Sequence, residues 1–106
     1  MKIAQIMLAS GMGGAEGYFV ALSKALAARG HEVVVICERR FERRDELEAC
    51  FGVTVFPVTV LGRWDRLAGW RIKKILQSCR PQLVHLHLAR AAHLGGCAAK
   101  ALSIPT

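Results

Sequence analysis

A glycine cluster near the start of the chain is the first stretch whose residues could bind a ligand. Gly11-Met12-Gly13-Gly14 stands between an apolar run and a long helical pattern. If the apolar run is a strand, the glycines lie in the turn after it, where the free N–H groups of a helix start favour an anion. Glycine also permits a tight turn that binds nothing. The residues alone support both interpretations equally.

The same glycines fit a dinucleotide-binding fingerprint only in part. The motif G-x-G-x-x-G matches at Gly11 and Gly13, but Glu16 occupies the place of its third glycine. Glu38 stands about 20 residues further on, where an acid would bind a ribose hydroxyl. Glu16 would also place a negative charge at the helix end that receives a pyrophosphate. A nicotinamide-binding domain of an oxidoreductase is therefore an alternative rather than the leading interpretation.

Two histidines form the second candidate group. His85 and His87 are one residue apart in a short apolar run, and alternate residues of a strand face the same side. We expect His87, at the carboxyl end of that strand, to open into a ligand cleft and His85 to be a core histidine. No cysteine or carboxylate stands at a recognisable zinc spacing from the pair, so no metal site is predicted.

Composition indicates a single small domain with an apolar core. The 106 residues are 53% hydrophobic and carry a formal charge of +7, so an anionic partner must be considered. We interpret the four widely spaced cysteines as buried, reduced thiols of a cytoplasmic protein. No run approaches the ~20 apolar residues that span a membrane. The cysteines are Cys37, Cys50, Cys79 and Cys97.

Basic residues gather around Trp70. The group could form a solvated face, or it could contact an anionic membrane surface with Trp64 and Trp70 as interfacial anchors. A second group, Arg39 to Arg44, alternates with acids and is interpreted as a solvated face. Nucleic acid is not expected, because the strands lack the stacking aromatics of RNA-binding sheets. The basic residues around Trp70 are Arg66, Arg71, Lys73, Lys74 and Arg80.

Hydrophobic periodicity predicts alternating strands and helices. Gly30 is placed to end the first helix in a left-handed conformation, and Pro57 makes the third strand an edge strand or ends it near Phe56. The alternation predicts a Rossmann-like parallel sheet with helices on both faces. An unfinished sheet would expose an edge through which the chain could form a homodimer. The predicted strands are 3–8, 32–37, 53–61 and 83–87, and the predicted helices are 15–29, a short segment ending near 51, 67–79 and 89–102.

Three segments together resemble a known family. They are Gly13-Gly14-Ala15-Glu16, Arg29-Gly30-His31-Glu32-Val33 and Pro81-Gln82-Leu83-Val84-His85-Leu86-His87. In this order they resemble the N-terminal domain of the retaining glycosyltransferases of family 4, which have the GT-B fold. Gln82 departs from the aspartate usual in the family. The resemblance implies that residues 1–106 are part of the acceptor-side half, without the C-terminal donor-binding domain.

The resemblance also implies a function and its residues. Gly13 and Gly14 would offer backbone N–H groups to a nucleotide-sugar donor, Glu16 fits the family pattern at the helix start, and His87 would lie near the reaction centre. The implied reaction transfers a sugar, with retention and without a metal cofactor, to a glycan or lipid-linked hydroxyl in cell-surface polysaccharide or lipopolysaccharide synthesis. The chain alone is expected to be inactive. A non-catalytic module that binds a membrane or a protein is the other alternative.

Overall fold

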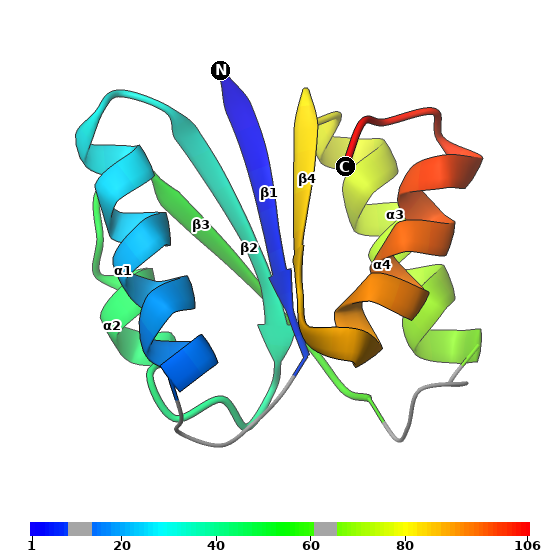
Figure 1. The fold of residues 1–106 in the computed structure, drawn as a ribbon, viewed down its shortest axis with the longest axis horizontal. Coiled ribbons are helices and arrows are strands. Elements are labelled where there is room, and N and C mark those ends of the chain that lie inside the picture. Colours follow the sequence, from blue (N-terminus) through cyan, green and yellow to red (C-terminus); the bar gives the residue numbers. More distant parts are fainter. Residues whose placement is uncertain (9–13, 61–65) are drawn as a thin grey trace.

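The computed structural model describes residues 1–8, 14–60 and 66–106, with the side chains of 14–16 and 88–94 left out. Strands and helices alternate along this part of the chain, as the hydrophobic periodicity predicts (Figure 1). The third strand ends three residues before the predicted end, and the other strands and long helices agree within one residue. The elements are β1 (Lys2–Met7), α1 (Gly14–Ala28), β2 (Glu32–Glu38), α2 (Arg44–Glu48), β3 (Val53–Val58), α3 (Arg66–Cys79), β4 (Leu83–His87) and α4 (Leu88–Ala101).

The four strands form one parallel sheet in the order β3-β2-β1-β4. Pro57 lies on β3, at an edge of this sheet, so its missing N–H is not needed on the outer side. The edge position predicted for this strand is confirmed, although β3 continues past Phe56 to Val58. At the opposite edge, the N–H of Val84 donates to the carbonyl of Pro105 at 2.8 Å, so the segment after α4 returns to β4.

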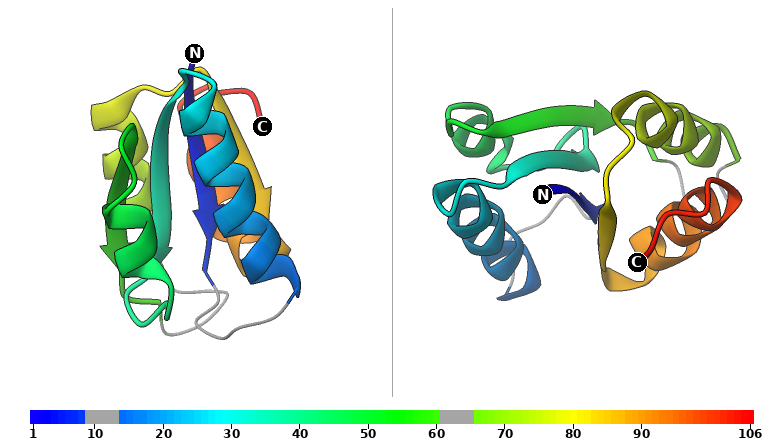
Figure 2. Two further views of the ribbon diagram at one scale, coloured as in Figure 1. Left: turned by 90° about the vertical axis from the view of Figure 1, so that its left-hand side faces the viewer. Right: turned by 90° about the horizontal axis from the view of Figure 1, so that it is seen from above.

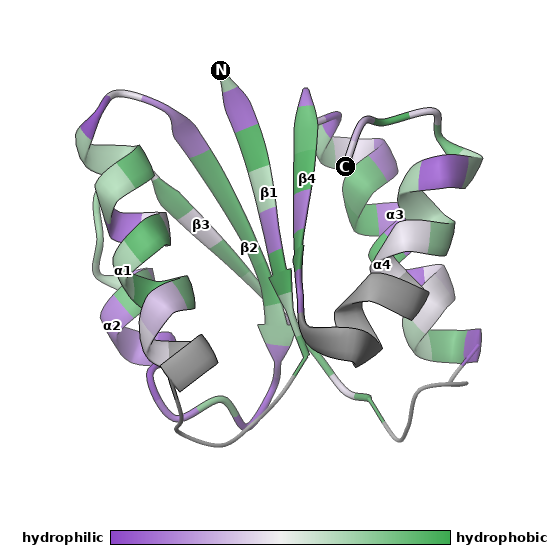
Figure 3. Cartoon of the chain, viewed as in Figure 1, coloured by the Kyte–Doolittle hydropathy of each residue, from purple (hydrophilic) through white to green (hydrophobic). Residues whose placement is uncertain are grey.

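Each face of the sheet is covered by two helices (Figure 2). Alternate residues of the strands point to opposite faces, and both faces are mainly apolar because both are covered. Figure 3 shows the strands as largely hydrophobic, with hydrophilic bands on β1 and β4. The predicted Rossmann-like architecture is therefore confirmed. The core under α1 and α2 contains Met7, Phe19, Val20, Val33, Val35, Cys37, Phe41 and Leu47. The core under α3 and α4 contains Ala4, Ile6, Leu8, Val34, Ile36, Val58, Val60, Ala68, Ile72, Leu76, Val84, Ala98, Ala99 and Ile104.

Two glycines have structural roles in this arrangement. Gly30 has a φ of +90°, which confirms the left-handed end predicted for the first helix. Gly95 lets α4 approach the sheet closely, because a Cβ there would lie 2.8 Å from Leu86 Cδ2 and 3.0 Å from Ile6 Cδ1. The close approach fixes α4 against β1 and β4.

The cysteines are all free, but they do not share one environment. Cys37 is buried in the core under α1, and burial raises the pKa of its thiol to about 12. Cys50 and Cys79 are half-buried and Cys97 is exposed, so the prediction of four buried thiols is confirmed for Cys37 alone. Because α4 is alanine-rich and carries small apolar residues on all sides, its hydrophobic pattern does not indicate which side faces the solvent.

Candidate functional site

The connections after β1 and β4 leave the sheet in opposite directions. The chain passes from β1 to α1 on one face and from β4 to α4 on the other, while β1 and β4 are hydrogen-bonded neighbours. Ligands of parallel open sheets bind beyond the carboxyl ends of the strands at such a switch point. Figure 1 shows the carboxyl ends of both strands together at the lower end of the molecule. This is the predicted location of the ligand.

The predicted donor-binding residues follow β1. Gly13 lies outside the described residues. Gly14 is the first residue of α1 and Glu16 lies in its first turn, and the carboxylate of Glu16 also lies outside the description. The predicted strand–turn–helix order is confirmed, while the contacts of these residues stay a prediction.

His87 is the last residue of β4, but its side chain does not open into a cleft. It is 7% exposed and turns toward the face covered by α1. The ring of Phe19 packs edge-on against it at 5.1 Å between centroids, and the ring of Tyr18 lies at 6.2 Å. Its Nε2 lies 2.5 Å from Oε1 of Gln5, a buried residue of β1. The expectation of an open histidine is therefore wrong, because the aromatic residues of α1 cover it.

The surroundings of His87 favour its neutral form. Burial, together with the smaller effect of the nearby His85, lowers the pKa of the imidazole to about 4. With the amide oxygen of Gln5 as acceptor, Nε2 carries the proton and Nδ1 is the basic nitrogen. The amide nitrogen of Gln5 is buried without a hydrogen-bond partner. The pair is thus a neutral polar group inside an otherwise apolar layer.

His85 lies beside His87 as the spacing predicts. Their ring centroids are 4.2 Å apart with an angle of 33° between the planes, which confirms that both side chains share one face. His85 is half-buried rather than a core histidine, so that prediction is wrong in degree. Its strand is an edge of the sheet, where α1 covers only part of the face.

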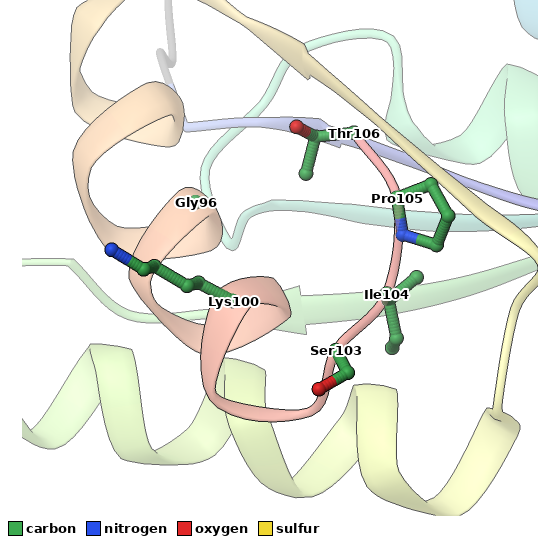
Figure 4. A pocket seen from close by; sticks show the side chains of 6 residues that line it. All are labelled: Gly96, Lys100, Ser103, Ile104, Pro105 and Thr106. Atoms are coloured by element: carbon green, nitrogen blue, oxygen red, sulfur yellow. The ribbon is translucent and has the colours of Figure 1, made fainter.

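Two cavities differ in their distance from the switch point. The larger one, about 500 Å³, lies beside the start of β4 and the end of α4, away from the carboxyl ends of the strands (Figure 4). A smaller cavity of about 290 Å³ lies at the carboxyl ends of β2 and β3. Sequence reasoning identified only Glu38 there, as an acid at the end of a parallel strand. The smaller cavity is lined by Glu38, Arg39, Arg40, Thr59 and Val60.

Helix α3 has an exposed side that combines aromatic and basic residues. Leu67 and Trp70 are each 56% exposed, and the ammonium of Lys74 lies 5.5 Å from the centre of the Trp70 ring. Lys73 is also exposed, and the helix contains no acidic residue. Trp64 lies outside the described residues. Within the described ranges, no helix is long and apolar enough to cross a bilayer, and no three potential metal ligands gather.

The sequence profile of Glycosyltransferase Family 4 matches residues 12–106. The chain belongs to this family. Membership confirms the resemblance predicted from the three sequence segments, and it favours a glycosyltransferase over a nicotinamide-binding domain. No curated protein matches the chain at a significant level.

Solved structures share the fold of this family 4 chain at low sequence identity. MurG of Acinetobacter baumannii has a TM-score of 0.76 at 18% identity, and the match covers 99% of this chain and 34% of MurG. HepE (Alr3699) of Anabaena, solved with UDP and glucose, has a TM-score of 0.71 at 23% identity, and the match covers 99% of this chain and 28% of HepE. VinC, solved with dTDP, has a TM-score of 0.70 at 18% identity, and the match covers 99% of this chain and 33% of VinC. The chain therefore spans about a third of the length of these proteins.

Proposed function

We propose that this family 4 chain is the acceptor-side N-terminal part of an enzyme that transfers a sugar from a nucleotide sugar. The acceptor is a hydroxyl of a glycan or of a lipid-linked sugar, and the anomeric configuration is retained. The switch point between β1 and β4, with α1 starting beyond β1, is the observation that carries this proposal. The nucleotides solved with HepE and VinC support a nucleoside diphosphate donor.

In the proposed site, the start of α1 faces the donor diphosphate. The backbone N–H groups of Gly13 and Gly14 would donate to it, with Glu16 in the same turn as part of the donor site. The residues that stabilise the leaving diphosphate belong to a donor-binding half, and no metal is required for that stabilisation. We place the whole enzyme in the cytoplasm, in the synthesis of cell-surface polysaccharide or lipopolysaccharide.

His87 is proposed to act at the reaction centre as a neutral group. Glycosyl transfer passes through a state in which positive charge develops on the sugar ring. A neutral imidazole adds no repulsion to that charge, and its bond to Gln5 holds the carboxyl end of β4 beside the reaction centre. His87→Phe keeps an aromatic ring against Phe19 but removes that bond. We expect it to lower kcat at least tenfold, while variants of the half-buried His31, at the other end of the sheet, keep the wild-type rate.

The test of the proposed function uses the complete protein that contains this chain. UDP, dTDP and their sugars should raise its unfolding temperature, because a ligand that binds only the folded state stabilises it. One of those sugars should be transferred to an acceptor hydroxyl. Stabilisation by NAD(H) without any response to these nucleotides would overturn the proposal. Residues 1–106 alone should transfer no sugar, and measured transfer by them would contradict the prediction that a separate donor-binding half is needed.

Helix α3 supports a second proposal, peripheral contact with an anionic membrane. Its exposed stripe contains Leu67, Trp70 and Lys74 at helical spacing, with Lys73 beside it. Exposed apolar residues flanked by cations are typical of helices that lie in the membrane interface. Such a contact would bring the enzyme to a lipid-linked acceptor. The alternative is a solvated helix whose tryptophan has no partner.

A further inference from the structure

The smaller cavity lies at the same end of the sheet as the switch point between β1 and β4, where the ligand is expected. Its lining comes from the end of β2 and from the segment after β3, and all strands of the sheet are parallel. The carboxyl ends of these strands therefore face the same side as those of β1 and β4. At about 290 Å³, it is at the lower limit of small-molecule pockets, which are typically ~300–1,000 Å³. A single sugar ring suits that size.

Glu38 is a charged residue built into the wall of this cavity. It is the last residue of β2 and is 2% exposed. Its Oε2 accepts the backbone N–H of Arg40 at 2.6 Å, and its Oε1 accepts Nε of the same residue at 3.3 Å. Each carboxylate oxygen accepts one of these bonds and has a further lone pair that can accept another. Sugar hydroxyls are donors that fit this acceptor.

Two arginines at the mouth of the cavity add positive charge. The backbone of Arg39 is held on both sides, since its N–H donates to the carbonyl of Val58 at 2.7 Å and its carbonyl accepts Nη1 of Arg44 at 2.9 Å. The side chain of Arg40 is 76% exposed and bonds Glu38 through Nε, which leaves its two terminal nitrogens available to a ligand. A guanidinium fork matches a carboxylate or a phosphate group.

We propose that this cavity is an acceptor subsite for a negatively charged sugar. Glu38 and the hydroxyl of Thr59 hydrogen-bond the sugar hydroxyls, and Arg39 and Arg40 bind the anionic group. The inference rests on the proposed glycosyltransferase function, and it narrows the acceptor to sugars that carry a phosphate or a carboxylate. The competing explanation is that Glu38 only stabilises the turn to Phe41, whose N–H donates to the Glu38 carbonyl at 3.0 Å.

The experiment is a titration of the ¹⁵N-labelled 106-residue chain followed by NMR. Glucuronate and glucose 6-phosphate are the sugar anions, and glucose and inorganic phosphate are the separate parts. We expect the sugar anions to shift the backbone amides of Arg40 and Thr59, with Kd values at least tenfold below those of either part. Comparison of the two sugar anions shows which anionic group the subsite prefers. The absence of shifts at these amides with every probe would overturn the proposal.

Variants separate binding from the structural role of Glu38. E38Q should weaken the binding of both sugar anions at least tenfold. T59V should also weaken this binding, but it leaves the turn from Glu38 to Phe41 unchanged. R29Q removes an exposed arginine at the other end of the sheet and should bind like the wild type. Equal binding by phosphate and glucose 6-phosphate, unaffected by E38Q and T59V, would reveal an anion site only and would overturn the sugar subsite. If E38Q unfolds, T59V alone decides.

The test of the subsite and the test of the proposed function can fail separately. If the complete protein binds sugar anions at Arg40 and Thr59 but does not bind nucleotide sugars, the proposed function is overturned and the subsite is kept. If it transfers a sugar from a nucleotide sugar but binds no sugar anion at these residues, the subsite is overturned and the proposed function is kept.

Discussion

The imidazole of His87 bonds Gln5 diagonally across β1 and β4. Gln5 is paired in register with His85 and Met7 with His87, yet Nε2 of His87 lies 2.5 Å from Oε1 of Gln5. Both side chains are buried beneath α1. The bond therefore joins the two strands that flank the switch point, at the end of the sheet where the ligand is expected.

A double-mutant cycle should show that this pair is coupled. Q5L leaves the Nε2–H group of His87 buried without an acceptor, and H87F leaves the amide oxygen of Gln5 without a donor. Each single change should cost about 1–3 kcal/mol of the free energy of unfolding. The double variant Q5L/H87F should be more stable than the sum predicts by about 1 kcal/mol, because no polar group is then left unpaired. Denaturant unfolding measures all four proteins, and additive costs would contradict the coupling.

The stability of the chain should depend on pH through His87. The pKa of this imidazole is about 4 in the folded protein, against an ordinary value of 6.5. Between these values the unfolded chain binds more protons, so stability falls as the pH drops from 6.5 to 4 and is fully present above 6.5. The loss at pH 5 is about 2 kcal/mol.

Imidazole NMR signals and unfolding curves at pH 7.5 and pH 5 measure this effect. The H87F variant is the control. Its unfolding free energy should differ between the two pH values by about 2 kcal/mol less than that of the wild type, because the variant has no imidazole at this position. A His87 signal that titrates near 6.5 would show that the ring is not shielded by Phe19 and Gln5, and it would refute the prediction.

The order of strands and helices could be predicted from the sequence because local periodicity determines it. Pro57 even indicated the edge strand, since a residue without an N–H is tolerated there. The burial of His87 could not be predicted. It depends on Phe19, which is distant in the chain and reaches the ring only after α1 packs on the sheet. The strand–turn–helix order around the glycines could be predicted, with Gly14 as the first residue of α1, while their ligand stays a prediction.

The subsite at Glu38 shows the same limit. The sequence placed an acid at the end of the second strand, which the structure confirms. The other lining residues come from the end of β3, and only the parallel pairing of β2 with β3 brings Thr59 near Glu38. A local motif cannot report a cavity whose walls come from two segments 20 residues apart.

The two adjacent glycines of α4 should respond oppositely to alanine. At Gly96, a Cβ would meet only Leu86 Cδ1 at 3.5 Å, so G96A should stabilise the helix by about 0.5–1 kcal/mol. At Gly95, the same Cβ would lie 2.8 Å from Leu86 Cδ2 and 3.0 Å from Ile6 Cδ1. G95A should therefore be less stable than G96A by about 1–2 kcal/mol, since the gain in helix propensity is the same. Equal unfolding free energies would show that α4 does not pack this closely.

Binding to anionic vesicles should depend on the exposed stripe of α3. Each lysine near a negative membrane surface contributes about 1 kcal/mol, so K73E/K74E should lower the partition coefficient at least tenfold on vesicles of phosphatidylcholine and phosphatidylserine. W70A should weaken binding at all salt concentrations, because it removes an apolar anchor rather than a charge.

Vesicle co-sedimentation distinguishes a specific stripe from the net charge of +7. R29E is the matched control for K73E, because each changes one exposed cation to an anion and Arg29 follows α1 on the opposite face of the sheet. If the stripe binds the membrane, K73E should weaken binding several times more than R29E, and added salt should reduce the difference. Equal losses would mean that overall charge alone attracts the chain, and full binding by K73E/K74E would exclude an electrostatic contact through α3.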